Sequence, residues 1–185
     1  MVFRCNAAPI EKFAEDAGRK TNLTTFNPSI FVTRYNSLSQ TDDLDRFNSD
    51  MRQYSGIIMM TCFGAAQSFN TCAESLEHRT FTDPKLTIAH PSEIVNLWNY
   101  WKNMKTLKRP STGFLIVHES IQLCEETHLY GFWPFPLKLD STVQRLPYHY
   151  FDTIAPSQAH GMNTEFSIFV QYHELGIIRI HTGKC

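Results

Sequence analysis

Short, largely apolar runs recur along the first half of the chain, each with the length of a buried strand. Three of these runs predict strands: residues 2–6 (VFRCN), 55–63 (SGIIMMTCF) and 86–91 (LTIAHP). A fourth run, residues 23–31 (LTTFNPSIF), predicts a β-rich segment that is stopped by Asn27 and Pro28. The first half of the chain is therefore expected to contain several strands.

Amphipathic segments lie between or after these runs and predict helices. Segment 41–54 places its large apolar side chains on one helical face: Leu44, Phe47 and Met51. Thr41 stands in the N-cap position of that helix, because its hydroxyl can accept a hydrogen bond from the first turn. Residues 92–105 predict a second helix, with Ser92 as its cap.

The stretch from 110 to 135 holds the densest pattern. Pro110 and Ser111 open a predicted helix. The apolar residues of that helix form a broad buried face: Leu115, Ile116, Ile121, Leu123 and Cys124. Residues 127–133 (THLYGFW) then predict a strand that ends at Gly131 in a turn. Short strands alternating with helices favour the α/β class, with a mostly parallel sheet flanked by helices.

Two features of this stretch are candidates for ligand binding, because ligands of parallel sheets bind outside the carboxyl ends of the strands. Ser111, Thr112 and Gly113 lie at a predicted helix N-terminus, where free N–H groups and the helix dipole favour an anion. Trp133 follows a predicted strand directly, where its indole can cover a flat ligand. A structural role also explains each of these features when it is considered alone. Ser111 could be only an N-cap, and Trp133 could be only the edge of a core.

Composition narrows the class of protein. The 185 residues are enough for one domain, and 42% hydrophobic with 19% charged residues is typical of a soluble globular protein. The formal net charge is −1 and the basic residues are scattered, so nucleic acid is not an expected partner. The sequence has no apolar run of roughly 18 residues, and its N-terminus lacks the apolar core of a signal peptide.

Cysteine and histidine spacing argues against a metal centre. The five cysteines form no Cys-x-x-Cys pair: Cys5, Cys62, Cys72, Cys124 and Cys185. Their odd number means that at least one is free or is bonded outside this chain. No His-x-x-x-His or mixed Cys/His pattern is present, so we expect no bound metal. Asn22 begins the one Asn-x-Ser/Thr sequon, which matters only if the protein enters the secretory pathway.

Two histidines stand out near the C-terminus, in residues 148–165 (YHYFDTIAPSQAHGMNTE). His149 and His160 lie eleven positions apart, and Glu165 follows five positions after the second. The spacing alone does not separate a catalytic pair from two structural histidines. The remaining histidines are most simply surface or structural residues: His78, His90, His118, His128, His173 and His181.

Four segments in order resemble the motifs of the animal sialyltransferases. Residues 1–29 resemble the second half of the large motif, 111–135 the small motif, 149–152 the third motif and 160–165 the very small motif. The stretches RCN, TNLTTFNPS, EETHLYGFWPF and LPYHY are most similar to the α-2,8-sialyltransferase branch, oligosialyl type III. One departure is Phe151, which stands where the third motif of the family has a second tyrosine. Residues 36–85 match the family only loosely.

The resemblance implies a catalytic domain over residues 1–185 with a Rossmann-like, GT-A-like sheet. It implies an inverting, metal-independent enzyme that transfers sialic acid from CMP-sialic acid to the 8-hydroxyl of a terminal sialic acid on glycoproteins or glycolipids. His160 would be the general base, because a neutral imidazole accepts a hydroxyl proton near neutral pH. The residues implied to contact the CMP donor are Asn6, Ser111, Thr112, Gly113, Trp133, Tyr148 and His149. His149 would donate to the departing phosphate, and Glu165 would either orient its neighbourhood or cap a helix.

The resemblance also implies an upstream part of the protein: a signal anchor in the Golgi membrane, a stem and the first half of the large motif. That half would supply the first strand or strands of the sheet and two cysteines, which would pair with Cys124 and Cys185. The catalytic domain would then lie in the Golgi lumen. Two alternatives stay open: a non-catalytic, sialyltransferase-like fragment that binds nucleotide or sialoglycan, and an enzyme that transfers to galactose. The family pattern assigns no pairing to Cys5, Cys62 or Cys72.

Overall fold

The computed structural model describes residues 1–64, 66–103, 109–139, 145–155 and 159–183. The chain divides into two compact units, Met1–Glu93 and Ile94–Cys185. The expected single domain over residues 1–185 stays a prediction. None of the helices in the described ranges combines the length and the apolar character needed to cross a membrane.

The first unit is built on a parallel sheet, as the alternation of strands and helices predicted. Its strands are β1 (Phe3–Arg4), β2 (Leu23–Phe26), β3 (Ile57–Met60) and β4 (Lys85–Ile88), in the order β1-β2-β3-β4. Each neighbouring pair is parallel, with Leu23 opposite Ile57 and Ile57 opposite Lys85. The four predicted strands are confirmed, although each is shorter than the apolar run that predicted it.

Burial differs between the strands. Thr24, Thr25 and Phe26 of the inner strand β2 are fully buried. Strand β4, expected to be buried, instead alternates between exposed and half-buried residues. Its place at the end of the strand order explains this difference, because in the described part of the sheet it has a neighbour on one side only.

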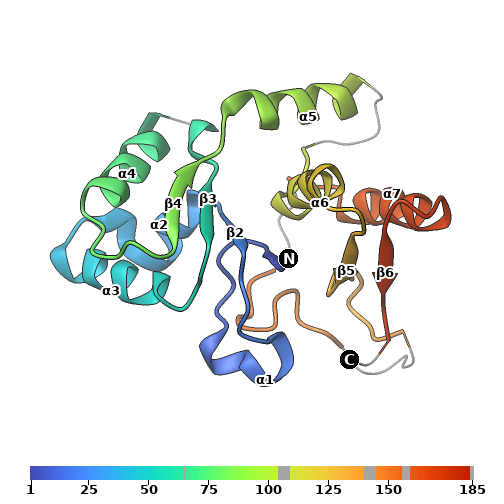
Figure 1. The fold of residues 1–185 in the computed structure, drawn as a ribbon, viewed down its shortest axis with the longest axis horizontal. Helices are drawn as coiled ribbons and strands as arrows, with labels where there is room; N and C mark the ends of the chain where they lie inside the picture. The colour runs from blue at the N-terminus through green and yellow to red at the C-terminus, as the bar shows by residue number, and fades with distance from the viewer. Residues whose placement is uncertain (65, 104–108, 140–144, 156–158, 184–185) are drawn as a thin grey trace. The chain divides into compact units, whose positions relative to one another are not determined.

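Helices connect the strands of this sheet (Figure 1). The connections contain α1 (Ala14–Ala17), α2 (Ser29–Tyr35), α3 (Thr41–Met51) and α4 (Ala66–Glu77), with the 3-10 turns Glu11–Phe13, Asn36–Leu38 and Cys62–Gly64. Asn27 and Pro28 do stop β2, but the residues after them form α2 rather than more β structure. The Asn27 side chain accepts a hydrogen bond from Ser29 N at 3.2 Å.

Helix α3 is confirmed, but its cap is not Thr41. Gln40 occupies the N-cap position, and its backbone N–H donates to Asp43 Oδ2 at 3.2 Å in a capping box. Thr41 is therefore the first helical residue. Phe47 and Met51 are fully buried, as the apolar face predicted.

An aromatic cluster forms the core between this sheet and its helices. The ring centroids of Phe26 and Phe31 are 4.6 Å apart. Those of Tyr35 and Phe47 are 5.4 Å apart, with the rings edge to face. All four rings are buried, and they pack with Met51, Ile58 and Met60 in one cluster. Burial of these large side chains against β2 and β3 fixes helices α2 and α3 on the sheet.

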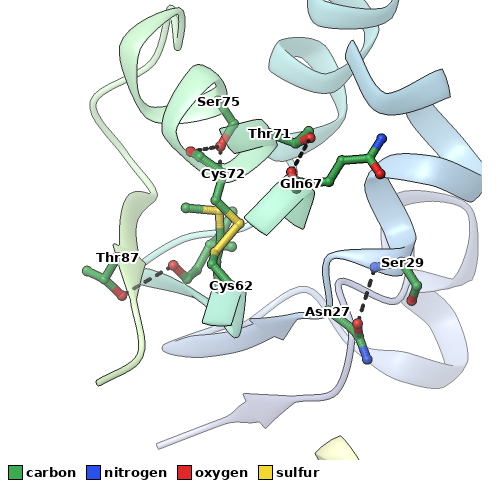
Figure 2. Close-up of a disulfide and its surroundings, with 10 residues drawn as sticks. Asn27, Ser29, Cys62, Gln67, Thr71, Cys72, Ser75 and Thr87 are labelled. Carbon is green, nitrogen blue, oxygen red and sulfur yellow. Dashed lines mark hydrogen bonds between the residues drawn. A yellow bond between two sulfur atoms is a disulfide. The ribbon is translucent and has the colours of Figure 1, made fainter. Parts of the chain in front are cut away.

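A disulfide between Cys62 and Cys72 joins the end of β3 to helix α4 (Figure 2). The sequence assigned no partner to either cysteine. Both cysteines are fully buried, and Ser75 Oγ donates to Cys72 O at 2.7 Å in the next turn of α4. The disulfide therefore fixes the carboxyl end of β3 to the helix that follows it.

The second unit combines helices with a two-stranded parallel sheet. Its elements are α5 (Pro91–Asn103, which begins in the first unit), α6 (Thr112–Leu123), β5 (His128–Tyr130), α7 (Met162–Glu174) and β6 (Arg179–His181). A buried core joins them through Phe114, Val117, Leu129, Ile168, Phe169 and Ile178.

Two predictions for this unit were wrong in detail. Helix α5 begins at Pro91, so Ser92 lies in its first turn, and residues 104–105 of the predicted helix fall outside the described residues. Leu123, expected on the buried face of α6, is 63% exposed because it ends the helix. The predicted strand over 127–133 is confirmed as β5, and Gly131 makes the turn after it with φ of 75°.

Candidate active site

The start of α6 is fixed by a buried carboxylate. Ser111 is the N-cap, as predicted, and its Oγ accepts a hydrogen bond from Phe114 N at 3.0 Å. Ser111 also donates twice to Glu165, from N to Oε1 at 2.7 Å and from Oγ to Oε2 at 2.5 Å. Glu165 is only 2% exposed and lies in the first turn of α7. Two helix N-termini that are far apart in sequence are therefore tied together.

This arrangement changes what Ser111 can offer a ligand. Both of its donors are already used by Glu165. The next two residues of the helix, Thr112 and Gly113, occupy positions whose N–H groups have no partner inside an α-helix. An anion at this helix start would therefore be bound by the backbone of Thr112 and Gly113 together with the helix dipole.

Glu165 is itself electrostatically unusual. Burial raises the pKa of its carboxyl above the ordinary value of 4.5, and burial outweighs the two hydrogen bonds from Ser111, which lower the pKa. A proton on His160 would lower the pKa of Glu165 as well. Glu165 therefore senses the charge of the candidate base, which precedes it by five residues.

A backbone carbonyl fixes the tautomer of the His160 ring. Its Nδ1 lies 3.0 Å from Arg109 O, and a carbonyl can only accept, so Nδ1 carries the hydrogen. In the neutral ring this tautomer leaves the lone pair on Nε2. The His160 side chain is partly exposed, so Nε2 can reach a substrate hydroxyl.

His149 is held differently. Its Nδ1 lies 2.9 Å from Asp152 Oδ1, three residues further along the chain. Its ring stacks on Phe151, with 5.0 Å between ring centroids and an interplanar angle of 4°, and meets the Tyr148 ring at 4.4 Å in a tilted arrangement of 39°. Phe151 therefore contributes the face of its ring, a contact that does not need the hydroxyl of the family tyrosine.

Asp152 is a functional candidate that the sequence reasoning did not single out. Its Oδ1 also accepts a hydrogen bond from Ile154 N at 3.1 Å, which fixes the carboxylate against the backbone. The signal was present as a histidine followed by an aspartate three residues later. A carboxylate that accepts from one imidazole nitrogen fixes the tautomer and supports positive charge on the ring.

Trp133 belongs to a small aromatic cluster. Its Nε1 donates to Leu137 O at 2.7 Å, and its ring meets Phe135 at 4.9 Å and Phe166 of α7 at 5.7 Å, edge to face. The indole N–H is therefore satisfied inside the protein. Any ligand contact by Trp133 would use the face of its ring.

Asn6 lies in the first unit, two residues after β1 ends, on the carboxyl side of that strand. Its buried Oδ1 has no hydrogen-bond partner among the described residues. The structure thus brings together Ser111 and Glu165, and places the Tyr148 ring against the His149 ring, within the second unit. Asn6 belongs to the other unit, and the donor-site assignments stay predictions.

The other expectations from the sequence concern a disulfide cysteine, a glycosylation sequon and the absence of a metal. Cys124 ends α6 with a free thiol, and its implied partner and Cys185 lie outside the described residues. Asn22 Oδ1 accepts from Val2 N at 2.8 Å, and Thr24 of its sequon is fully buried, so its glycosylation stays a prediction. Where the structure describes side chains, no three of His, Cys, Asp and Glu gather as metal ligands.

One of the other histidines, His118, has a clear structural role. Its Nδ1 lies 2.8 Å from Phe114 O and its Nε2 lies 3.3 Å from Tyr172 Oη. Burial lowers the pKa of His118 below its ordinary value, which favours the neutral ring.

Comparison with proteins of known sequence supports the motif resemblance. The chain is 32% identical over 188 residues to Alpha-2,8-sialyltransferase 8E of Homo sapiens. The matched region covers 100% of this chain and 50% of that protein. It is 34% identical over 192 residues to Alpha-2,8-sialyltransferase 8F of Mus musculus, of which it covers 47%. The chain thus spans about half the length of these curated relatives.

Comparison with solved structures supports the fold. A crystal structure of a mammalian sialyltransferase matches with a TM-score of 0.63 at 24% identity, covering 100% of this chain and 60% of that one. A mammalian sialyltransferase in complex with Gal-beta-1-3GalNAc-ortho-nitrophenol matches with a TM-score of 0.59. The expected α/β class is confirmed.

The profile of Glycosyltransferase family 29 (sialyltransferase) matches residues 1–177, which is nearly the whole chain and includes all four motif segments. The resemblance read from those motifs is confirmed, and the chain belongs to glycosyltransferase family 29, the sialyltransferase family.

Proposed function

We propose that the protein is a sialyltransferase that uses CMP-sialic acid as donor and the 8-hydroxyl of a terminal sialic acid on glycoproteins or glycolipids as acceptor. Membership of family 29 and the α-2,8-sialyltransferase names of its relatives support this proposal. The observation that carries the mechanism is the contrast between the two histidines. His160 is held by a neutral carbonyl and His149 by a carboxylate.

His160 is the general base. The acceptor hydroxyl attacks the anomeric carbon of the sialic acid, and its proton moves to Nε2 of His160. The new bond forms on the face opposite the departing CMP, so the configuration inverts. Positioned proton transfer of this kind is worth roughly a hundredfold to ten-thousandfold in rate.

His149 stabilises the leaving group. As the bond between the anomeric carbon and the phosphate oxygen breaks, the electron pair stays on CMP and the phosphate gains negative charge. An imidazolium at His149 would donate to that phosphate from Nε2, because Nδ1 is engaged by Asp152. This contact strengthens as charge develops, so it stabilises the transition state more than the bound donor.

The start of α6 completes the donor site in this proposal. The N–H groups of Thr112 and Gly113 would bind the CMP moiety, and Glu165 would hold the helix start in place through Ser111. The leaving phosphate is then stabilised by an imidazolium and a helix N-terminus. This chemistry requires no metal ion, and the protein would act in the Golgi lumen as a membrane-anchored enzyme.

The proposal is tested with the protein purified in the form in which its source cell produces it. CMP release is measured with CMP-sialic acid and a sialyl-lactosamine acceptor, and the linkage of the product is then analysed. We expect CMP release that depends on the acceptor, and a product with an α-2,8 bond. Transfer to galactose would contradict the acceptor assignment. Binding of CMP without transfer would favour a non-catalytic binding protein.

A further inference from the structure

The turn that carries Asn6 has an unfavourable backbone conformation. Asn6 and Ala7 have φ of 54° and 42°, a region that two consecutive residues with side chains rarely occupy. Such strain persists only where the surrounding structure enforces it, and it is common at binding sites. The buried, unpartnered Oδ1 of Asn6 lies at the same place.

The neighbouring strand provides part of the restraint. Asn6 N donates to Thr25 Oγ1 at 2.9 Å and Ala7 N donates to Thr25 O at 2.9 Å. These two bonds fix the donors of the turn against β2. They leave the carbonyl side of the turn to be fixed by other groups.

Two side chains from different segments converge on the Ala7 carbonyl. Tyr54 Oη donates to Ala7 O at 2.7 Å, and Arg34 Nη1 donates to the same oxygen at 2.8 Å. Tyr54 precedes β3 and is 3% exposed, while Arg34 comes from α2. A carbonyl oxygen has two lone pairs, so these two donors fully satisfy it and fix the orientation of the peptide that follows Asn6 and Ala7.

We propose that Tyr54 and Arg34 are positioning residues for Asn6. They hold the left-handed turn so that the Asn6 amide is fixed for contact with the CMP moiety of the donor. The inference rests on the proposed function, and on the donor contact that the family resemblance implies for Asn6. It extends the donor site to two residues that bind no ligand themselves and lie outside the sialyl motifs.

The core of the first unit offers a matched control for the test. Tyr35 is also buried, at 1% exposed, and its Oη donates to Asp50 Oδ2 at 3.0 Å. Tyr54→Phe and Tyr35→Phe each remove one hydrogen-bonded phenol hydroxyl from the same buried cluster. Both are expected to lower the melting temperature by similar amounts, but only Tyr54→Phe removes a hydrogen bond from the turn that carries Asn6.

The experiment measures the Kd of CMP by titration calorimetry and the KM of CMP-sialic acid for both variants. We expect Tyr54→Phe to raise both constants about fivefold, the equivalent of one hydrogen bond, with kcat changed less than about twofold. Tyr35→Phe should leave both constants within about twofold of the parent protein. Arg34→Ala should resemble Tyr54→Phe, and Arg34→Lys should recover part of the loss because it keeps a donor.

Equal constants for Tyr54→Phe and Tyr35→Phe would overturn the positioning role. Asn6→Ala separates this failure from failure of the donor site itself. If Asn6→Ala raises the Kd of CMP and Tyr54→Phe does not, the positioning inference alone is wrong. If Asn6→Ala leaves the Kd unchanged, both the donor contact at Asn6 and its positioning are wrong.

Discussion

The buried carboxylate of Glu165 makes a prediction for stability. In Glu165→Ala, the N–H and the O–H of Ser111 lose their acceptors, while Ser111 itself is 8% exposed. Each unsatisfied buried donor costs about 1–3 kcal/mol. The cost of leaving both Ser111 donors unsatisfied is partly offset, because the variant no longer buries a desolvated carboxyl group. We expect the free energy of unfolding to fall by about 2–3 kcal/mol.

Glu165→Gln separates hydrogen bonding from charge. The amide keeps an acceptor for Ser111 N–H and places a donor beside Ser111 Oγ, so the loss should be about 1 kcal/mol or less. Glu174→Gln, at the exposed end of the same helix, is the matched control and should leave stability unchanged. Urea unfolding followed by circular dichroism measures all of these variants.

The contribution of Glu165 to the free energy of unfolding should decrease as pH rises. Burial raises the pKa of Glu165 above 4.5, so the folded state holds this proton more tightly than the unfolded chain does. The contribution of this group to stability is therefore fully present below pH 4.5 and falls as pH rises through the raised pKa. Glu165→Gln should remove that slope. A slope that is unchanged in Glu165→Gln would refute the account of the buried carboxylate.

Two further predictions follow from other contacts of the described residues. Asp152→Asn keeps an acceptor for His149 but removes the charge that supports an imidazolium, so kcat should fall roughly tenfold to hundredfold with little change in KM; a change in KM alone would contradict the leaving-group role. Replacing Cys62 and Cys72 together by serine opens a loop with a sequence separation of 10, which should lower the free energy of unfolding by about 2–3 kcal/mol in urea. Unchanged stability there would show that the disulfide does not restrain the unfolded chain.

Local sequence patterns predicted some of the elements, because periodicity reports which face of a strand or helix is buried, but they gave no prediction for α2, α4, α7 or β6. The strands β2 and β3 and the helices α3 and α6 were all predicted from apolar spacing. The caps were less predictable. Gln40 and Thr41 are adjacent polar residues, and the choice between them depends on a reciprocal bond with Asp43 that no single position reveals.

The contacts that build the candidate site could not be predicted from local sequence patterns. Glu165 and Ser111 are separated by 54 positions, so their pairing depends on how α6 and α7 pack. The sequence singled out both residues but left Glu165 with two possible roles. The bonds of Tyr54 and Arg34 to Ala7 span 47 and 27 positions, and the sequence pointed to neither residue. Motif spacing identifies reactive groups, whereas the residues that orient them emerge from tertiary packing.

The role of His160 as the base of sialyl transfer can be tested by removing its imidazole. The rate of CMP release with a saturating acceptor is compared between the parent protein and His160→Ala, beside the Kd of CMP for each. We predict a loss of roughly a hundredfold to ten-thousandfold in kcat with an unchanged Kd. A His160→Ala protein that kept the full rate of transfer would contradict the account.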